Sequence, residues 1–574
     1  MDGKTMQKYN LWLQNALEDI DLTNELNNIS NSEDEISDRF YRELEFGTGG
    51  LRGVIGAGDN RMNIYTVRKA TQGLADYLKL RYASSSVAIS FDSRIKSDLF
   101  AREAARVLAG NGITVHIFTQ LQPTPVLSFA VRELGCQAGI MVTASHNPSK
   151  YNGYKCYGAD GCQMTDNDAG EVTGFIKNVD VFEGVTISDF DQALNSGLIS
   201  EIPSSLVENF FEKVEEQQVN KGICQRVPLG VVYTPLNGAG NIPVREILRR
   251  IGVQHVSVVP EQEMPDGRFP TVPYPNPEIR QAFECAISLA KSVKPDILLA
   301  TDPDCDRVGI AVAHEGDYRL MSGNEVGCLV LNYLLSCKSA NGTLPKKPVF
   351  IKTIVTSDLA ARIAEKYNCE VIEVLTGFKY IGEQITRLEN EGRADSYVFG
   401  FEESYGYLSG THVRDKDGVL ASMLVCEMTA YYKEQGKNLI QVLDELYASH
   451  GVYHNILINA EFEGSQGMET MERIMKGLRE DRPDEIAGLR VVGFSDYLSS
   501  RSIDMKTGKT AEIDLPKSNV LSFSLEGNAG VIVRPSGTEP KIKAYITAAG
   551  ADADKAASMA GQLTAAAEKL LKGI

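Results

Sequence analysis

Asp302, Asp304 and Asp306 alternate in one short polar segment, and this spacing could place three carboxylates around a single cation. Carboxylate oxygens without a His or Cys partner are the donor set that suits Mg²⁺. Cys305 lies between the aspartates, but a soft thiolate is a poor match for this ion. An EF-hand calcium loop would need Gly at its sixth position, where this chain has Arg307. The alternative to a metal site is a solvated acidic loop.

A hydroxyl nucleophile is offered by the hexapeptide Thr143-Ala-Ser-His-Asn-Pro148, which directly follows the apolar run 138–142. Ser145 has His146 beside it, and the amide of Asn147 could donate a hydrogen bond, so the neighbours provide a setting that could activate a serine. A Ser-His dipeptide alone is usually a solvated turn. The whole hexapeptide after a strand is a more specific indication of chemistry.

The segment 534–541, Arg-Pro-Ser-Gly-Thr-Glu-Pro-Lys, could bind a phosphate group. Arg534 offers a bidentate fork, Ser536 and Thr538 offer hydroxyls, and Gly537 lets backbone N–H groups approach an anion. Lysines at 541 and 543 add positive charge. The alternative is an ordinary turn between two prolines.

A fourth polar loop, 400–406, follows the extended run 397–399 and carries Glu402 and Ser404 between glycines. A carboxylate and a hydroxyl side by side can bind vicinal hydroxyls of a sugar. A charged surface turn is the alternative, and the aromatic residues at 401, 405 and 407 make a purely solvated loop less favoured. Arg307, next to the aspartates, would be a good phosphate ligand.

Two further segments carry basic residues in a glycine-rich setting. The loop 46–53 includes Thr48 and Arg52, but it lacks the GxGxxG pattern of a dinucleotide site. The segment 412–418 places Lys416 shortly after the Glu-Glu-Ser loop. A flexible surface loop is the alternative for both. Nucleophile, carboxylates, sugar-binding pair and phosphate loop together predict a metal-assisted enzyme acting on phosphosugars.

Strand-like and helix-like segments alternate from about residue 40 to 450, which predicts βαβ units in α/β domains with mixed sheets. The unit 229–233, 240–250 and 255–259 has counterparts at 87–118 and 349–374. After residue 452, strands at 453–462, 519–525, 530–534 and 542–548 and helices at 468–480 and 551–571 predict a smaller α+β domain. We therefore predict three similar α/β domains and a fourth domain around a central cleft, with these bounds: 1–205, 206–322, 323–452 and 453–574.

The composition excludes several classes of protein. Hydrophobic residues make up 43% of the 574 residues, so several cores can be buried. A net charge of −18 argues against binding nucleic acid or anionic lipid through bulk charge. No signal-peptide pattern and no apolar run of about 20 residues is present, so we expect no membrane span. Ten scattered cysteines without a CxxC pair predict reduced thiols and a cytoplasmic location.

The four loops together, in this order, resemble those of the α-D-phosphohexomutase superfamily, which comprises phosphoglucomutases and phosphomannomutases. The resemblance covers residues 40–574. It implies that Ser145 is a phosphoserine, that the three aspartates and its phosphate hold Mg²⁺, and that glucose 1,6-bisphosphate is the intermediate and activator. The implied partner is a small phosphosugar, with no nucleic acid or membrane, and the implied enzyme is a monomer or weak homodimer.

The resemblance also carries over roles for the remaining residues. It implies catalytic roles for Ser145, His146, Lys155, Lys416 and Arg52. It implies substrate contacts for Thr48, Arg307, Thr376, Gly377, Glu402, Ser404, Arg534, Ser536, Gly537, Thr538 and Lys543. The implied activity interconverts glucose 1-phosphate and glucose 6-phosphate through a phosphoserine enzyme.

The sugar loop departs from the common pattern of the family. Glucose enzymes resemble Gly-Glu-Glu-Ser and dual glucose/mannose enzymes Gly-Glu-Met-Ser, so Glu403 favours glucose. The inserted Phe401 and the segment Thr376-Gly-Phe-Lys379 resemble a longer branch that includes phosphopentomutases. Phosphopentomutase or phosphomannomutase activity is therefore the alternative within the family. A serine/metal phosphatase and a non-catalytic sugar-phosphate binder are the alternatives outside it. Neither accounts for the whole set of loops, because hydrolysis needs no second phosphate site and a binder needs no intact nucleophile.

Overall fold

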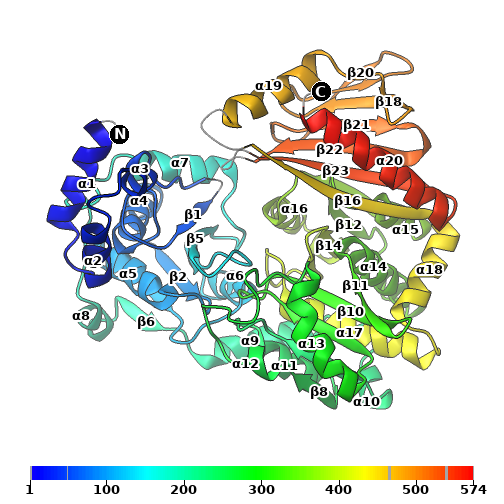
Figure 1. The fold of residues 1–574 in the computed structure, drawn as a ribbon. Helices are drawn as coiled ribbons and strands as arrows, with labels where there is room; N and C mark the ends of the chain where they lie inside the picture. The colour runs from blue at the N-terminus through cyan, green and yellow to red at the C-terminus, as the bar shows by residue number, and fades with distance from the viewer. Residues whose placement is uncertain (1–2, 48, 463–466, 537–540, 573–574) are drawn as a thin grey trace. The chain divides into compact units, whose positions relative to one another are not determined.

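The computed structural model describes residues 3–47, 49–462, 467–536 and 541–572. These residues form two compact units (Figure 1). The first comprises the chain up to Gly323 together with Phe378–Gly436, and the second comprises Asn324–Gly377 and the chain from Lys437 onward. The residues predicted to carry the nucleophile and the metal all fall in the first unit. The predicted domain bounds at 205, 322 and 452 stay predictions.

The first sheet of the first unit is mixed, with strand order β1-β5-β4-β2-β3-β6. Its strands β2, β3, β4 and β6 run parallel, whereas β5 and β1 join antiparallel at one edge. The strands are β1 (Gly50–Val54), β2 (Ser86–Phe91), β3 (Thr114–Ile117), β4 (Ala138–Val142), β5 (Tyr151–Gly158) and β6 (Ile199–Glu201). Every residue of β4 is buried, as expected for a central strand covered on both faces.

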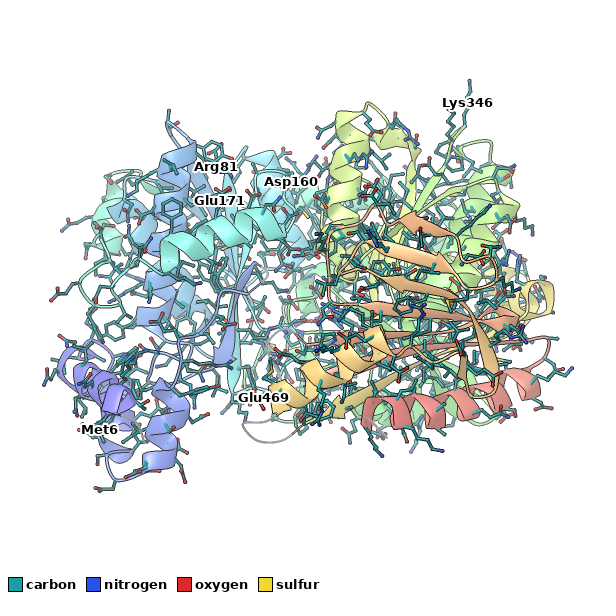
Figure 2. The ribbon with its side chains drawn as sticks, turned by 90° about the horizontal axis from the view of Figure 1, so that it is seen from above. Met6, Arg81, Asp160, Glu171, Lys346 and Glu469 are labelled. Carbon is teal, nitrogen blue, oxygen red and sulfur yellow. The ribbon has the colours of Figure 1, made fainter. Side chains whose placement is uncertain are left out.

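Helices cover both faces of this sheet. Residues of α4, α5 and α7 share one apolar core with the strands, whereas α6 packs on the strands without joining that core. The helices are α1 (Gly3–Asn15), α2 (Ile20–Asn28), α3 (Glu33–Phe40), α4 (Ile64–Arg81), α5 (Ser97–Gly110), α6 (Thr124–Glu133), α7 (Asp166–Ile176), α8 (Phe190–Asn195) and α9 (Ser204–Glu215). On the surface, Arg81 of α4 donates to Glu171 of α7 at 2.8 Å (Figure 2).

The second sheet of this unit has the order β11-β10-β9-β7-β8, with β9, β7 and β8 parallel and β10 and β11 antiparallel. Its elements are α10 (Ile223–Arg226), β7 (Gly230–Thr234), α11 (Asn241–Arg250), β8 (His255–Val258), α12 (Pro260–Glu263), α13 (Arg280–Val293), β9 (Ile297–Thr301), β10 (Val308–His314) and β11 (Asp317–Met321). The unit is completed by α16 (Phe378–Asn390), η1 (Ala394–Ser396), β14 (Tyr397–Glu402), β15 (Gly406–Leu408) and α17 (Gly418–Glu434).

The second unit contains a parallel pair, β12 and β13, and an antiparallel sheet of order β16-β23-β22-β21-β18-β19-β20, with β17 on β18. In Figure 1, α20 runs along this sheet beside β23. The elements are α14 (Gly323–Ala340, its first residue in the other unit), β12 (Val349–Thr353), α15 (Asp358–Lys366), β13 (Glu370–Val374), α18 (Leu439–His450), β16 (Val452–Glu461), α19 (Gly467–Glu480), β17 (Glu485–Ile486), β18 (Leu489–Asp496), β19 (Arg501–Asp504), β20 (Thr510–Glu512), β21 (Leu521–Leu525), η2 (Glu526–Asn528), β22 (Ala529–Pro535), β23 (Lys541–Gly550) and α20 (Ala553–Lys572).

Three predicted loops are shorter than the sequence suggested. Arg52 lies in β1, paired opposite Gly153, because the strand begins within the glycine-rich segment. Glu402 is the last residue of β14 rather than part of a free loop. Arg534 belongs to β22. In β14 and β22 cross-strand pairing extends the ladder past the last apolar residue, and in β1 pairing with β5 includes part of the glycine-rich segment. A hydrophobicity pattern reveals neither effect.

Two further expectations concern the cysteines and membrane-spanning helices. All ten cysteines are free thiols. Within the described ranges, no helix is long and apolar enough to cross a membrane.

Candidate active site

Ser145 follows the carboxyl end of β4 and is 3% exposed. Its backbone is left-handed, with φ of +50°, which is uncommon for a residue other than glycine. Its N–H donates to Thr143 Oγ1 at 2.8 Å. Strained backbone of this kind persists only where neighbouring contacts hold it, and it is frequent at functional sites.

The hydroxyl of Ser145 joins the two loops that the sequence singled out separately. Oγ donates to Asp302 Oδ2 at 2.6 Å and lies 3.2 Å from His146 Nδ1. Asp302 follows the carboxyl end of β9, so the two loops extend from the carboxyl ends of central strands in the two sheets. Crevices outside such strand ends are the usual ligand sites of open α/β sheets.

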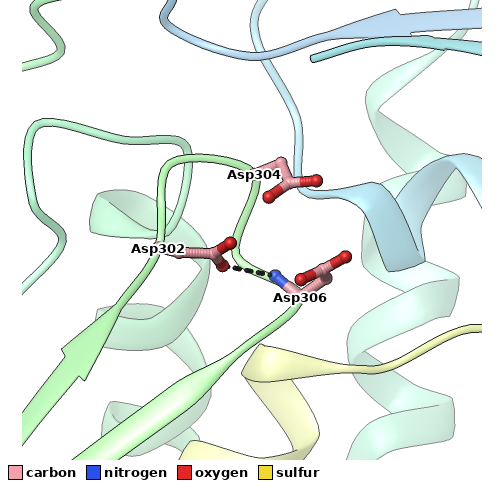
Figure 3. Close-up of side chains that lie close together, drawn as sticks. All are labelled: Asp302, Asp304 and Asp306. Atoms are coloured by element: carbon pink, nitrogen blue, oxygen red, sulfur yellow. Dashed lines mark hydrogen bonds between the residues drawn. The ribbon is translucent and has the colours of Figure 1, made fainter. Parts of the chain in front are cut away.

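The three aspartates project from one loop toward a common space (Figure 3). One ligand oxygen from each lies within 4.8 Å of the others, and all three residues are buried. Asp302 Oδ1 accepts the backbone N–H groups of Asp306 at 3.1 Å and Arg307 at 3.0 Å, which closes the loop. Cys305 is buried with a left-handed φ of +51°, and its thiol is not among the clustered ligand atoms.

Two oxygens of this cluster accept no hydrogen bond from the part of the chain that the structure describes. Asp304 Oδ1 and Asp306 Oδ1 are buried without a hydrogen bond to any described residue. Unpaired buried acceptors are costly and call for an explanation such as a bound ion. An all-oxygen donor set is the one that suits a hard divalent cation. The residues present therefore fit a metal ion.

The pKa values of Asp302 and Asp304 are shifted in opposite directions. Burial, followed by the charges of Asp304 and Asp306, raises the pKa of Asp302 well above its ordinary value. Burial also acts to raise the pKa of Asp304, but the ammonium of Lys155 and a hydrogen bond from Thr124 hold it below the ordinary value. Like charges in one buried site force such a division.

Two lysines supply countercharge to the cluster. Lys155 of β5 places Nζ 2.9 Å from Asp304 Oδ2 and 3.5 Å from Asp306 Oδ2. Lys416 Nζ lies 3.2 Å from Asp306 Oδ2 and 2.9 Å from Asp415 Oδ1. Burial alone would lower the pKa of both ammonium groups, but the carboxylates outweigh it and raise both.

Further cations surround Ser145 and the aspartates. The guanidinium of Arg307 donates to the carboxylate of Glu278. Arg52 Nη1 donates to Asn147 Oδ1 at 3.3 Å. Desolvation, then the charges of Arg307 and Arg52, lowers the pKa of His146 well below its ordinary value, so its imidazole is neutral at pH 7.

The predicted sugar loop is a tight turn between β14 and β15 that contains Ser404. Glu402 is buried at 5% exposure, and Tyr405 is left-handed with φ of +66°. The carbonyl of Tyr405 accepts the N–H of Val308 at 3.1 Å, which ties the turn to the strand after the aspartate loop. Burial, then the charge of Glu402, raises the pKa of Glu403 to about 7.

The predicted phosphate loop lies in the second unit. Arg534 and Lys543 stand directly opposite one another on β22 and β23, and Ser536 N–H donates to Lys541 O at 2.7 Å. Thr376 Oγ1, in the same unit, is buried without a hydrogen bond to a described residue, and Gly377 has φ of +130°. Thr48, Gly537 and Thr538 lie outside the described residues.

Several residues of this neighbourhood were missed at the level of sequence: Asp92, Arg94, Thr124, Glu278 and Asp415. Asp92 and Arg94 follow the apolar strand β2 just as the predicted loops follow theirs. The same criterion would have found them. Thr124 and Glu278 acquire their place only from tertiary contacts with Asp304 and Arg307. Asp415 acquires its place from a hydrogen bond that the hydroxyl of Tyr157 donates to it.

Comparison with known proteins places this site in a family. Models of the phosphoglucomutase/phosphomannomutase alpha/beta/alpha domains I, II and III match residues 43–181, 208–316 and 322–450. The chain belongs to the phosphoglucomutase/phosphomannomutase family. The predicted fold class, three α/β domains with mixed sheets followed by an α+β domain, is thereby confirmed.

Two bacterial phosphoglucomutases are similar to this chain over most of their length. The phosphoglucomutase of Staphylococcus epidermidis (strain ATCC 12228) is 38% identical over 506 residues, which are 88% of this chain and 90% of that protein. The phosphoglucomutase of Staphylococcus aureus (strain MSSA476) is 37% identical over 548 residues, or 95% of this chain and 96% of that protein.

Solved structures share the fold at lower identity. A putative phosphomannomutase from Thermus thermophilus has a TM-score of 0.69 and 23% identity, covering 92% of this chain and 99% of that one. The open form of parafusin, a phosphoglucomutase from Paramecium, has a TM-score of 0.68 and 17% identity, covering 92% and 96%.

We predict that Glu403→Gln changes the pH dependence of stability. The folded pKa of Glu403, about 7, exceeds the ordinary 4.5. Between pH 4.5 and about 7, the carboxyl of Glu403 is ionised in the unfolded chain but still protonated in the folded protein. The free energy of unfolding therefore decreases as pH rises through this range, and the full decrease is reached above pH 7. The variant should therefore melt at a higher temperature than wild type at pH 8 and at a similar temperature at pH 5.

The matched control is Glu133→Gln, an exposed glutamate at the end of α6. It should shift the melting temperature equally little at both pH values. A Glu403→Gln profile parallel to wild type from pH 5 to pH 8 would contradict the raised pKa.

Proposed function

We propose that this protein is a phosphoglucomutase that interconverts glucose 1-phosphate and glucose 6-phosphate through a phosphoserine at 145 and a glucose 1,6-bisphosphate intermediate. The observation that carries the proposal is the 2.6 Å hydrogen bond from Ser145 Oγ to Asp302 within the buried three-aspartate cluster. The relatives at 37–38% identity are phosphoglucomutases, which supports this activity over others of the family.

Mg²⁺ is the proposed cofactor, held by Asp302, Asp304, Asp306 and the phosphate on Ser145. When bound, it would neutralise charge on the transferring phosphoryl group, which is the main requirement of phosphoryl transfer. Charge compensation of the aspartates would also remove the field that raises the pKa of Lys155 and Lys416. A lysine relieved in this way can accept a proton from a sugar hydroxyl.

The chain's own residues then have distinct parts in the reaction. Ser145 gives its phosphoryl group to one sugar hydroxyl and later receives the other phosphate. Lys155 and Lys416 are the candidates for taking and returning the hydroxyl proton, because their ammonium groups are buried beside the cluster. His146 is neutral, so it can accept or donate a hydrogen bond at Ser145 Oγ without adding charge.

Substrate contacts are proposed for residues in both units. Glu402 and Ser404, with Thr376 and Gly377, would bind sugar hydroxyls. The phosphate that is not being transferred would be held by Arg534, Ser536, Gly537, Thr538 and Lys543. The pairing of Arg534 opposite Lys543 supports this assignment, because it places two basic side chains at the base of the same loop. Thr48, Arg52 and Arg307 are proposed to contact the phosphate being transferred.

Glu403 in the sugar turn favours glucose over mannose as the substrate. Activity on pentose phosphates is the alternative, and a comparison of substrates tests it. The decisive comparison is kcat/KM for glucose 1-phosphate, mannose 1-phosphate and ribose 1-phosphate with the matching bisphosphates. A cytoplasmic location and a monomeric or weakly dimeric state stay predictions.

We predict that active enzyme carries phosphate on Ser145 and that Ser145→Ala loses nearly all turnover. Removal of Oγ leaves no acceptor for the phosphoryl group. Intact mass and peptide mass spectrometry would locate the phosphate, and a coupled assay would measure the rate. Ser149→Ala, in the same loop, is the control and should retain activity. Near wild-type turnover of Ser145→Ala would disprove the nucleophile.

We predict that Asp304→Asn weakens Mg²⁺ binding and phosphoryl transfer together, because it removes one charge from the ligand set. In wild type, Mg²⁺ affinity should rise with pH, since the raised pKa of Asp302 means that binding releases a proton. Calorimetry in buffers of different ionisation enthalpy measures both effects. The control is Asp98→Asn, an exposed aspartate on α5. Full activity of wild type after prolonged treatment with EDTA would refute the metal requirement.

We predict that Arg534→Ala lowers kcat/KM by roughly 10- to 100-fold, because a lost charge-assisted contact costs about 1.5–3 kcal/mol. Ser145 should still accept phosphate from glucose 1,6-bisphosphate, and the variant should release more free bisphosphate per turnover. Arg490→Ala, an exposed arginine of β18, is the control. Unchanged kcat/KM together with unchanged bisphosphate release would show that this segment is only a turn and would weaken the case against a phosphatase.

A further inference from the structure

Arg94 lies just after β2, and its side chain is fully buried. Its guanidinium donates to four backbone carbonyls of the loop that carries the proposed nucleophile. These are the carbonyls of Ser145 at 2.5 Å, Pro148 at 3.0 Å, Tyr151 at 3.0 Å, and Asn147. One planar cation thus contacts the loop along its whole length, from the serine to the start of β5.

Arg94 combines one carboxylate partner with several backbone partners. A buried guanidinium is normally paired with a carboxylate, and Asp92 Oδ2 forms an ion pair with Nε at 3.5 Å. The ring of Phe269 lies 5.0 Å from the guanidinium carbon and covers one side of it. The Nη donors of Arg94 are used on backbone oxygens of the loop.

Asp92 is occupied in a second path to the same serine. Its carboxylate accepts Thr143 Oγ1–H at 2.6 Å and Ser97 Oγ–H at 2.8 Å. The proton of Thr143 is thereby directed to Asp92, which leaves its oxygen to accept Ser145 N–H at 2.8 Å. Asp92 thus fixes the amide side of Ser145, while Arg94 fixes the carbonyl side.

Both contacts bear on the strained conformation of Ser145. With φ of +50°, the serine sits in a region that is unfavourable for a residue with a side chain unless the surroundings impose it. An ordinary extended or helical φ would turn the side chain away from its present direction, in which Oγ reaches Asp302 at 2.6 Å. The amide and carbonyl on either side of this φ/ψ pair are the groups that Thr143 and Arg94 hold.

We propose that Arg94 is a positioning residue for the phosphoryl-accepting serine: it holds the backbone of loop 145–151 so that Ser145 Oγ faces the aspartate cluster. The expected loss of rate rests on the proposed mutase function, whereas the claim that Arg94 holds loop 145–151 rests on its hydrogen bonds alone. Arg94 uses its donors on the loop and is assigned no contact with sugar or phosphate. Its loss should therefore lower the rate of transfer and leave substrate binding unchanged.

The variants Arg94→Lys and Arg94→Met test the proposal. Lysine can replace one or two of the four hydrogen bonds, and methionine none, so the loss should be graded. We expect kcat to fall by roughly 10-fold or more for lysine and by roughly 100-fold or more for methionine, because a small misplacement of a reacting group has an effect of that order. KM for glucose 1-phosphate and the affinity for Mg²⁺ should stay within about twofold of wild type.

A matched control separates positioning from general stability. Arg68 of α4 is also buried, and it pairs with Glu18 at 2.7 Å and Glu103 at 2.6 Å. Arg68→Met should lower the melting temperature, but kcat measured well below that temperature should match wild type. Equal loss of kcat in Arg68→Met and Arg94→Met would mean that the effect is only destabilisation, and the proposal would be overturned.

Hydrogen–deuterium exchange supplies a readout that does not depend on activity. Peptides spanning 143–151 should exchange faster in both Arg94 variants and at the wild-type rate in Arg68→Met. If wild type has no mutase activity but exchange rises as expected, the proposed function fails while the positioning role stands. Faster exchange with unchanged kcat, or a loss confined to KM, would overturn the proposal. If Arg94→Met does not fold, Arg94→Lys and its exchange profile decide.

Discussion

Three carboxylates within 4.8 Å in a buried loop are the constraint on which the rest of this site depends. Bringing like charges together in a low-dielectric interior is costly, and the molecule compensates in two ways. Asp302 has a raised pKa and accepts a hydrogen bond from the hydroxyl of Ser145, whereas Asp304 stays ionised beside Lys155. Asp304 Oδ1 and Asp306 Oδ1 still have no hydrogen bond to a described residue, and a bound cation would compensate both oxygens.

Left-handed backbone at residues other than glycine occurs in several parts of the chain, and three of these residues lie in the predicted loops. Ser145, Cys305 and Tyr405 each adopt a left-handed conformation in a loop that the sequence marked as functional. Glycine would relieve the strain but would remove a side chain with a packing or chemical role. Cys305 illustrates the close packing: a Cβ on Gly418 would lie 2.4 Å from its carbonyl oxygen and 3.1 Å from its thiol, so only glycine fits beside this residue.

The sequence located the loops because each follows a short apolar run, and buried strands such as β4 and β9 are recognisable by that property alone. It could not show that Ser145 and Asp302, 157 residues apart, share a hydrogen bond, because that contact depends on how two sheets pack. It also missed the place of Arg52 in β1, which is set by pairing with β5. The position of Arg94 after an apolar strand could have been noticed, but its role could not, because backbone acceptors leave no trace in the pattern of side chains.

Charge balance links the metal and the phosphate. Asp302, Asp304 and Asp306 face Lys155 and Lys416, while Arg307 is matched by Glu278. A divalent cation adds two positive charges to this set, and a phosphoserine adds close to two negative ones. The cation alone would roughly balance the aspartates and the phosphoserine alone would add to their excess negative charge, whereas the two together would change the net charge of this set little. By linkage, whatever the proposed phosphoserine would contribute to metal binding, the metal would contribute equally to the equilibrium that phosphorylates Ser145. A chain with a net charge of −18 can thus bind dianionic sugar phosphates, because the local balance, rather than the total, determines what the site attracts.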